Sequence, residues 1–258
     1  MKKNDLSNFS YFKKSVYICR YSYYDFNSYK DMFIIIIAKG QFPTQPSLTS
    51  HFAMADRVVC CDGAFANYFS WCRLNHSHPS EVDVVGDGDS LPPALLQQAH
   101  EAALKVSRTV VSEQESNDLS KAVHYALQQV DEPSLSSEAV RIEILGATGL
   151  REDHTLGNIS LLAYYAMQFP NVQFTMVSDY GRFTPVRGKR TFQSHKGEQV
   201  SIFSFTPAQP VSVSGLRYPI EGRCLHWLWE GTLNESLGTS FEVSGGLLVV
   251  YQKSANAD

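Results

Sequence analysis

Short apolar segments that end in Gly and in acidic or amide residues recur through the first two-thirds of the chain. They are VVCCDGA (58–64), VDVVGDGDS (82–90), VVSEQESND (110–118) and IEILGATGLREDH (142–154). Helix-like sequence follows the first, third and fourth segments, with apolar residues recurring on one helical face. Alternation of strands and helices, beginning with a strand at 33–38, predicts right-handed crossovers and a mostly parallel sheet.

The pattern changes after residue 171. Short alternating runs follow, at 172–177, 183–185, 200–205, 211–213, 224–229 and 247–252, and Gly and Pro turns separate them. Such runs favour an antiparallel sandwich or partial barrel. The predicted fold class is therefore α/β plus all-β, with a mostly parallel open sheet and flanking helices before an antiparallel β-sandwich. The predicted domains are 32–170 and 171–258.

Residues 1–31 are rich in Tyr, Ser, Asn and Lys and show no periodicity. The apolar run Met32–Ala38 that follows is too short to span a bilayer, which takes about 20 residues, and it makes a poor signal peptide. We interpret 1–31 as an extension that is either disordered or not native, with Met1 or Met32 as the start. The mass of the natively expressed protein distinguishes the two starts.

Composition narrows the functional classes. The 258 residues carry a net charge of −4 with only 19% charged residues, so no basic surface for nucleic acid or anionic lipid is expected. The five cysteines show no metal-ligand spacing. Cys60 and Cys61 lie within an apolar strand and are interpreted as buried packing residues. A reducing cytoplasmic location fits this cysteine usage.

Acidic side chains follow several of the predicted parallel strands. Because the carboxyl ends of these strands share one edge, where ligands bind, five carboxylates are expected to meet there: Asp62, Asp87, Asp89, Asp118 and Asp153. So much negative charge requires a cation and suggests metal-assisted chemistry on a polyphosphate. Asp87 and Asp89 flank a glycine and suit Mg²⁺, although a Gly-Asp turn explains them as well. Asp118 alternatively caps its helix, as Ser116 or Asn117 could.

The segment 146–154 is a strand, a glycine loop and a helix start, where backbone N–H groups and the helix dipole favour anions. Arg151 can bridge phosphates there. No GxxxxGK[ST] sequence is present, which excludes the P-loop nucleotide enzymes. Gln114, on the loop before Asp118, either binds polar ligand atoms or faces water. Trp227 and Trp229 flank Leu228 on a predicted strand, either as sandwich core or as an aromatic wall for a flat heterocycle.

In this order along the chain, the motifs closely resemble those of the thiamin pyrophosphokinases. The matching segments are DGA-N (Asp62 to Ala64, with Asn67), GDGDS (86–90), the ND pair (Asn117, Asp118), GxxGxRxDH (146–154), GLRYP (215–219) and GTS (238–240). The resemblance covers about residues 33–252. It implies transfer of pyrophosphate from ATP to thiamine, giving thiamine diphosphate and AMP. It also implies a homodimer in which each site uses both chains.

The resemblance assigns roles to residues of this sequence. Mg²⁺ would bind Asp87, Asp89 and Asp118, and Asp62 and Arg151 would join these three in catalysis. ATP would lie near Gly146, Thr148, Gly149, Arg151, Asp153, His154 and Gln114. Thiamine would contact Asp62, Asn67, Thr239, Ser240 and Trp227. Asp62 or Asp118 would accept the hydroxyl proton of thiamine.

Three positions depart from the family pattern. Gly88 stands where a larger residue is usual, Asn117 where Thr is typical, and Phe241 where an Asn usually follows Thr-Ser. Two other functions use the same acidic edge: a metal-dependent phosphohydrolase with an aspartyl nucleophile, and a non-catalytic nucleotide- or vitamin-binding module. The first would leave the Gly-Arg-Asp-His element unexplained, and the second would not need five convergent acids.

Overall fold

The computed structural model describes residues 32–76, 81–113, 115–131, 134–135 and 139–255. Gln114 and residues 1–31 lie outside these ranges, so the predictions for them concern residues that the structure does not describe. None of the described helices has both the length and the apolar character needed to span a membrane.

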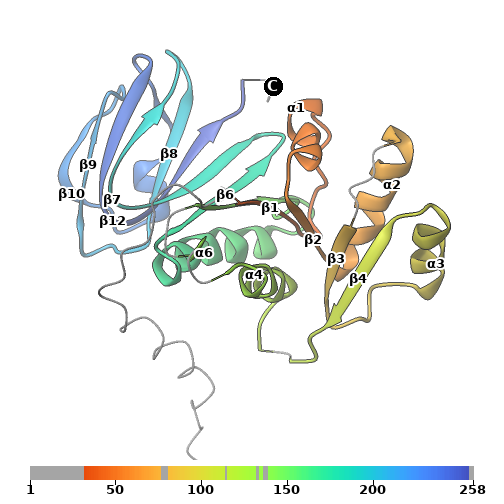
Figure 1. Ribbon diagram of the computed structural model, residues 1–258. Helices are drawn as coiled ribbons and strands as arrows, with labels where there is room; N and C mark the ends of the chain where they lie inside the picture. Colours follow the sequence, from red (N-terminus) through yellow and green to blue (C-terminus); the bar gives the residue numbers. More distant parts are fainter. Residues whose placement is uncertain (1–31, 77–80, 114, 132–133, 136–138, 256–258) are drawn as a thin grey trace, which may run out of the picture. The chain divides into compact units, whose positions relative to one another are not determined.

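Six parallel strands form one half of a continuous sheet (Figure 1). In spatial order they are β4 (Lys105–Val110), β3 (Glu81–Gly86), β2 (Arg57–Cys61), β1 (Met32–Ile37), β5 (Val140–Leu145) and β6 (Val172–Ser178). The central strands are apolar on both faces, as sequences such as MFIIII require when helices cover both sides of a sheet.

The helices divide between the two faces because the direction of progress across the sheet reverses after β4. The connections from β1 to β4 carry α1 (Pro46–Thr49), η2 (Ser50–Ala53), η3 (Asp62–Ala64), α2 (Phe65–Asn75) and α3 (Pro93–Glu101). The return through β5 to β6 carries α4 (Asp118–Gln128) and α6 (Glu152–Gln168). Right-handed crossovers then place α4 and α6 together on the opposite face, as Figure 1 shows. A hydrogen bond of 2.9 Å between the hydroxyls of Ser120 and Tyr165 joins them.

The sheet continues in antiparallel strands beyond β6. These are β7 (Gly181–Gln193), β8 (Gln199–Ser204), β9 (Pro210–Ser214), β10 (Ile220–Cys224), β11 (Asn234–Glu235) and β12 (Ser240–Lys253). β7 pairs with β6 and then with β12 along almost its whole length, and β12 also pairs with β8 and β9. The predicted combination of parallel and antiparallel parts is confirmed.

Two hydrophobic clusters underlie the two parts of the sheet. The larger surrounds the parallel strands and includes Cys60, Cys61 and Cys72 as buried thiols. The smaller fills the antiparallel part, where the rings of Phe192 and Phe241 stack 5.0 Å apart. Burial raises the pKa of the Cys60 thiol well above its usual value, so this cysteine is a packing residue, as predicted.

One strand differs from the sequence prediction. The run 172–177 was assigned to the antiparallel part, but β6 is parallel to β5, and the change of direction occurs between β6 and β7. Alternating burial along β6 shows that one of its faces is only partly covered. Such alternation does not depend on the direction of the neighbouring strand, so it could not distinguish a parallel from an antiparallel pair. The domain boundary at 170 stays a prediction.

Candidate active site

Asp62 lies at the carboxyl end of β2 and is buried, with only 2% of its surface exposed. Its carboxylate Oδ2 accepts a hydrogen bond of 3.3 Å from the backbone N–H of Ser90. Its side chain packs against Gly86, where an added Cβ would lie 2.4 Å from the Cβ of Asp62. Glycine at the end of β3 is therefore what allows the Asp62 carboxylate to approach the next loop.

The loop after β3 brings two further carboxylates to Asp62. The N–H of Asp89 donates to Oδ1 of Asp87 at 3.2 Å, and the Ser90 hydroxyl donates to Oδ1 of Asp89 at 2.8 Å. One carboxylate oxygen from each of Asp62, Asp87 and Asp89 lies within 4.8 Å of the others. Three oxygen ligands at this spacing fit a hard divalent cation such as Mg²⁺.

Asp118 follows β4 and begins α4 at the same edge. Its pKa is raised, chiefly by burial and further by the negative charges of Asp87, Asp62 and Asp89, while Lys121 opposes the shift. The ammonium of Lys121 lies 3.8 Å from Oδ1 of Asp118, and the Lys121 side chain is only 3% exposed. Asp118 is therefore near enough to interact electrostatically with the acidic group. The three most closely spaced carboxylates, however, are those of Asp62, Asp87 and Asp89.

Asn117, and not Asp118 or Ser116, caps helix α4. Its side-chain oxygen accepts a hydrogen bond of 2.9 Å from the N–H of Ser120. Thr can make the same bond, which explains why Asn can stand at a position where the family typically has Thr. The Asp118 carboxylate is therefore free of the capping role that the sequence left open.

Replacing Asn117 tests this capping role. Asn117→Ala is expected to destabilise the protein by about 1 kcal/mol, the usual effect of losing an N-cap, which corresponds to roughly 2–4 °C in melting temperature. Asn117→Thr is expected to melt within about 1 °C of the wild type. Thermal unfolding followed by circular dichroism measures both, and equal losses in the two variants would contradict the role.

The glycine loop after β5 is held by the loop after β1. Gly146 and Gly149 adopt φ values of 63° and 74°, which favour glycine. Gly40 donates to the carbonyl of Gly146 at 2.6 Å, and Gln41 donates to that of Thr148 at 2.8 Å. Asn158 on α6 is buried, and its side chain donates to the carbonyl of Ala147 at 2.7 Å.

Arg151 and Asp153 pair with each other at the start of α6. The Nη2 of Arg151 donates to Oδ2 of Asp153 at 2.6 Å, and both side chains are 65% exposed. The hydrogen bond from Arg151 lowers the pKa of Asp153. Of the five acids expected to converge, three lie within 4.8 Å of one another. Asp118 is near enough for the charges of these three to raise its pKa, whereas Asp153 pairs with Arg151 instead.

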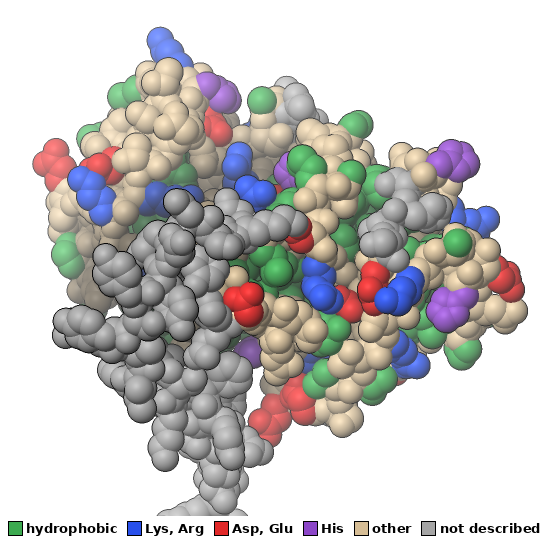
Figure 2. All heavy atoms as spheres, viewed as in Figure 1, with side chains coloured by type: hydrophobic (Ala, Val, Ile, Leu, Met, Phe, Trp, Pro, Cys, Tyr) green, Lys and Arg blue, Asp and Glu red, His purple; other side chains and the backbone are tan. Residues whose placement is uncertain are grey.

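Acidic and basic side chains are interspersed on the face of the molecule drawn in Figure 2. The sequence alone did not identify three basic side chains near the acidic group. Lys121 pairs with Asp118, Lys39 donates to the Ser90 hydroxyl at 3.3 Å, and Arg108 donates to the carbonyl of Gly88 at 3.0 Å. The signal for Lys39 was its place directly after a buried strand and before Gly40. Arg108 and Lys121 lie within a strand and a helix, whose sequences give no such signal.

The Arg108 guanidinium occupies the space beside Gly88. Gly88 has a φ of 87°, and a Cβ added there would lie 2.3 Å from a guanidinium nitrogen of Arg108. A larger residue, as is usual in the family pattern, would need another position for this guanidinium. The departure at Gly88 therefore goes together with an arginine on the neighbouring strand β4.

Two family models match the chain in succession. "Thiamin pyrophosphokinase, catalytic domain" matches residues 48–175, and "Thiamin pyrophosphokinase, substrate-binding domain" matches residues 181–251. The chain belongs to the thiamin pyrophosphokinase family. The predicted family and the predicted enzyme class, an ATP-dependent pyrophosphotransferase, are confirmed.

Relatives and solved structures agree with this family. Thiamine pyrophosphokinase of Bacillus subtilis is 27% identical over 183 residues, which are 67% of this chain and 78% of the relative. Thiamin pyrophosphokinase from Candida albicans has a TM-score of 0.69 at 19% identity, over 86% of this chain and 89% of that one. The yeast enzyme has a TM-score of 0.71 at 13% identity, over 88% of both chains. The two solved structures therefore have the same fold as this chain.

Apart from Asp62, which is buried, the residues that the family resemblance assigned to thiamine are exposed. Asn67 lies on α2, Ser240 begins β12, and Thr239 directly precedes that strand. Among the hydrogen bonds identified for the described residues, none joins these three to the acidic group, and Asp62 alone of the predicted thiamine residues lies within it. Their role in thiamine binding stays a prediction.

The predicted strand through Trp227 and Trp229 is wrong. β10 ends at Cys224, and a 3₁₀ turn, η4 (Leu228–Gly231), follows. The Glu230 carboxylate causes the turn, because it accepts hydrogen bonds from the N–H groups of His226 and Trp227 at 2.6 and 2.8 Å. Trp227 and Trp229 are 69% and 71% exposed, so neither belongs to the core of the antiparallel part.

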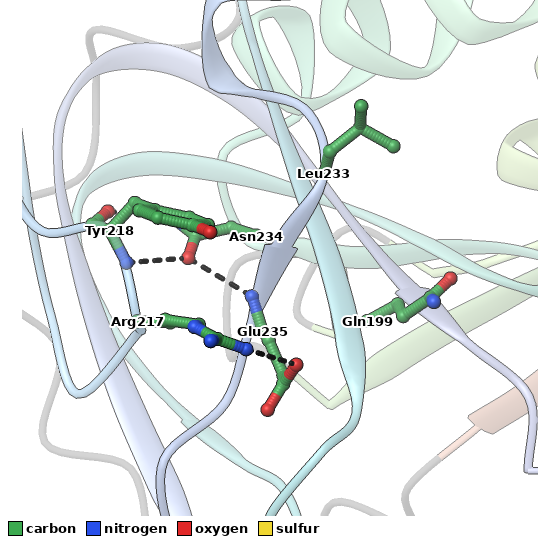
Figure 3. Close-up of a pocket in the computed structure, with 6 residues that line it drawn as sticks. All are labelled: Gln199, Arg217, Tyr218, Leu233, Asn234 and Glu235. Carbon is green, nitrogen blue, oxygen red and sulfur yellow. Dashed lines mark hydrogen bonds and ion pairs between the residues drawn. The ribbon is translucent and has the colours of Figure 1, made fainter.

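A pocket of about 130 Å³ lies beside this region (Figure 3), and its lining residues are Gln199, Arg217, Tyr218, Leu233, Asn234 and Glu235. Asn234 is buried and holds the segment 217–219, because its side chain accepts from the N–H of Tyr218 at 2.9 Å and donates to the Tyr218 carbonyl at 2.7 Å. The GLRYP motif is thus fixed by Asn234. Phe241 lies in the buried stack with Phe192, so its side chain presents no polar group at the surface.

Proposed function

We propose that this chain transfers pyrophosphate from ATP to thiamine, forming thiamine diphosphate and AMP at the carboxyl edge of the parallel strands. The observation that supports this site most directly is the group formed by Asp62, Asp87 and Asp89, whose oxygens lie within 4.8 Å of one another. The glycine loop 146–149 follows β5, and only β1 lies between β5 and β2 in the sheet. Carboxylates for a cation and a loop for phosphates then share one edge.

Mg²⁺ is the cation that these oxygen ligands fit best. Asp87, Asp89 and Asp118 would hold it, as the family resemblance implies, and the position of Asp62 supports its addition to this set. When bound, Mg²⁺ would neutralise charge on the phosphates during transfer. Catalysis by the protein would then consist of positioning and charge neutralisation. Arg151, which now pairs with exposed Asp153, could exchange that partner for a phosphate.

Asp118 is our candidate for accepting the proton of the thiamine hydroxyl. Its pKa is raised, mainly by burial, and a base becomes stronger as its pKa rises. Asp62 remains the alternative, because it lies within the carboxylate group and is buried. A comparison of the pH dependence of kcat in Asp118→Asn and Asp62→Asn would assign the proton acceptor.

The nucleotide would lie along the glycine loop, against Gly146, Thr148, Gly149, Arg151, Asp153 and His154. Thiamine would contact Asp62, Asn67, Thr239, Ser240 and Trp227. Exposure of Trp227 supports its inclusion, since an indole ring on the surface offers a flat apolar face. The proposed domains are 32–170 for ATP and metal and 171–258 for thiamine. The smaller hydrophobic cluster lies wholly within the second, and the larger extends from the first into β6 and to Val249.

A homodimer with shared sites and a cytoplasmic location complete the proposal. Exposed apolar side chains on the antiparallel part, Trp227, Trp229 and Leu233 among them, support contact with a second copy. The buried thiols of Cys60, Cys61 and Cys72 support a reducing compartment. Sedimentation equilibrium at micromolar concentration would measure the assembly.

The reaction is tested by incubating the protein with ATP and Mg²⁺, with and without thiamine, and separating the nucleotides and thiamine esters by chromatography. We expect AMP only when thiamine is present, in amounts equal to thiamine diphosphate. Formation of ADP would indicate transfer of a single phosphoryl group. Hydrolysis of simple phosphate esters without ATP would favour the phosphohydrolase alternative, and ligand binding without turnover would favour the binding module.

A further inference from the structure

Lys39 lies where ligands bind in open parallel sheets. It follows β1, whose two neighbours are β2 and β5. The connection leaving β1 leads toward β4, and the chain returns on the other side of β1 through β5, so the strand order reverses at this point. The crevice outside the carboxyl ends of the strands at such a reversal is the usual ligand position.

The Lys39 side chain reaches from this point toward the carboxylate group. Its stem crosses Gly63, where an added Cβ would lie 2.3 Å from Cδ and 2.7 Å from Nζ of Lys39. Its ammonium donates to the Ser90 hydroxyl at 3.3 Å. That hydroxyl donates to Asp89 at 2.8 Å, and the Ser90 N–H donates to Asp62 at 3.3 Å. One serine therefore separates the ammonium from two carboxylates.

The backbone is anchored on both sides of Lys39, and before it the N–H of Ala38 donates to the carbonyl of Leu145 at 2.8 Å. Gly40 and Gln41 donate to the carbonyls of Gly146 and Thr148 on the glycine loop. Further on, the Asp179 carboxylate accepts from the N–H and the hydroxyl of Thr44, at 2.9 and 2.7 Å to Oδ2. The exposed Lys39 side chain thus has a fixed base between the glycine loop and the acidic group, and its ammonium can turn from a neutral hydroxyl to a stronger acceptor.

We propose that Lys39 is a substrate-binding residue whose ammonium contacts the polyphosphate oxygens of ATP between the glycine loop and the carboxylate group. This proposal rests on the proposed pyrophosphate transfer. A phosphate oxygen carries negative charge, so it adds a Coulomb attraction for the ammonium that the neutral Ser90 hydroxyl lacks. Lys39 would therefore exchange Ser90 for phosphate when the nucleotide binds.

The test compares Lys39→Met, which removes the charge and keeps the length, with Lys39→Arg, which keeps the charge. Lys105→Met is the matched control, because Lys105 begins β4 at the opposite edge of the sheet, is 71% exposed and pairs with Glu81. Calorimetry with Mg²⁺ and α,β-methylene-ATP, whose corresponding bond resists transfer, measures binding without turnover. Steady-state kinetics give kcat and KM for both substrates, and thermal unfolding checks that each variant is folded.

We expect Lys39→Met to bind the ATP analogue roughly 10- to 100-fold more weakly, the range for losing a hydrogen bond to a charged group. KM for ATP should rise or kcat should fall, while KM for thiamine should change little. Lys39→Arg should recover most of the binding, and Lys105→Met should bind like the wild type.

Binding by Lys39→Met within twofold of the wild type would overturn the proposal. If that variant also bound Mg²⁺ more tightly, Lys39 would instead be a counter-charge of the carboxylates. A wild-type protein that binds the analogue and forms no thiamine diphosphate would refute the proposed function alone, because the binding comparison would still decide the role of Lys39. Failure of the wild type to bind the analogue would overturn both.

Discussion

Asp87→Asn is expected to lower the rate of thiamine diphosphate formation at least about 100-fold, the scale of losing a key electrostatic group in an active site. Asp87 is one of three residues whose carboxylate oxygens lie within 4.8 Å of one another. The change keeps the shape of the side chain and removes its charge, so the remaining oxygens would hold a divalent cation less well. The initial rate at saturating ATP, thiamine and Mg²⁺ measures the effect.

The matched control for this substitution is Asp131→Asn. Asp131 lies after α4, is exposed, and accepts a hydrogen bond of 2.7 Å from the N–H of Ser134. We expect this variant to keep a turnover within about twofold of the wild type, because its carboxylate is not among the closely spaced three. A near-wild-type rate for Asp87→Asn would remove Asp87 from the catalytic group.

Gly86→Ala is expected to reduce both stability and activity. The added Cβ would lie 2.4 Å from the Cβ and 3.4 Å from the Cα of Asp62, so the buried Asp62 or the end of β3 must move. Overpacking of this kind costs about 1–3 kcal/mol, and a shift of about 1 Å in a reacting group can lower the rate roughly 100-fold. Melting temperature and kcat, measured on the same preparation, test the two effects.

Gly157→Ala is the control for this glycine. Gly157 lies within α6, and apart from its chain neighbours and the backbone of its own helix, no atom comes within 4 Å of a Cβ added there. Alanine in a helix is favoured over glycine by about 0.5–1 kcal/mol, so this variant should be slightly more stable than the wild type and equally active. Unchanged activity in Gly86→Ala would show that Asp62 does not need its observed position.

The acidic edge could be predicted from the sequence because its signal is local. Apolar strands that end in Asp62, or in Asp87 and Asp89, specify both a buried strand and a carboxylate at its carboxyl end. The parallel arrangement of β2 and β3 then places them together without any further information. Asp153 does not lie with these carboxylates, because its side chain pairs with Arg151, two residues earlier in the chain.

Other features depend on side-chain contacts that the hydrophobic pattern does not show. The alternation in 224–229 fits a strand, but the Glu230 carboxylate binds two backbone N–H groups and turns the chain, which exposes Trp227 and Trp229. In the sequence Asn158 resembles a polar surface residue, but in the structure it is buried and donates to the carbonyl of Ala147. Lys39 is one lysine among many in the sequence, and its position beside Ser90 depends on two loops that are 51 residues apart.

The most direct test of pyrophosphate transfer is to follow ATP labelled at the β-phosphorus. Incubation with thiamine and Mg²⁺ is predicted to move the label into thiamine diphosphate, with an equal amount of unlabelled AMP, and Asp87→Asn is predicted to form almost none. This outcome requires cleavage between the α- and β-phosphates at the acidic edge. Label retained in ADP beside a phosphorylated thiamine, or label transfer that persists in Asp87→Asn, would contradict the account.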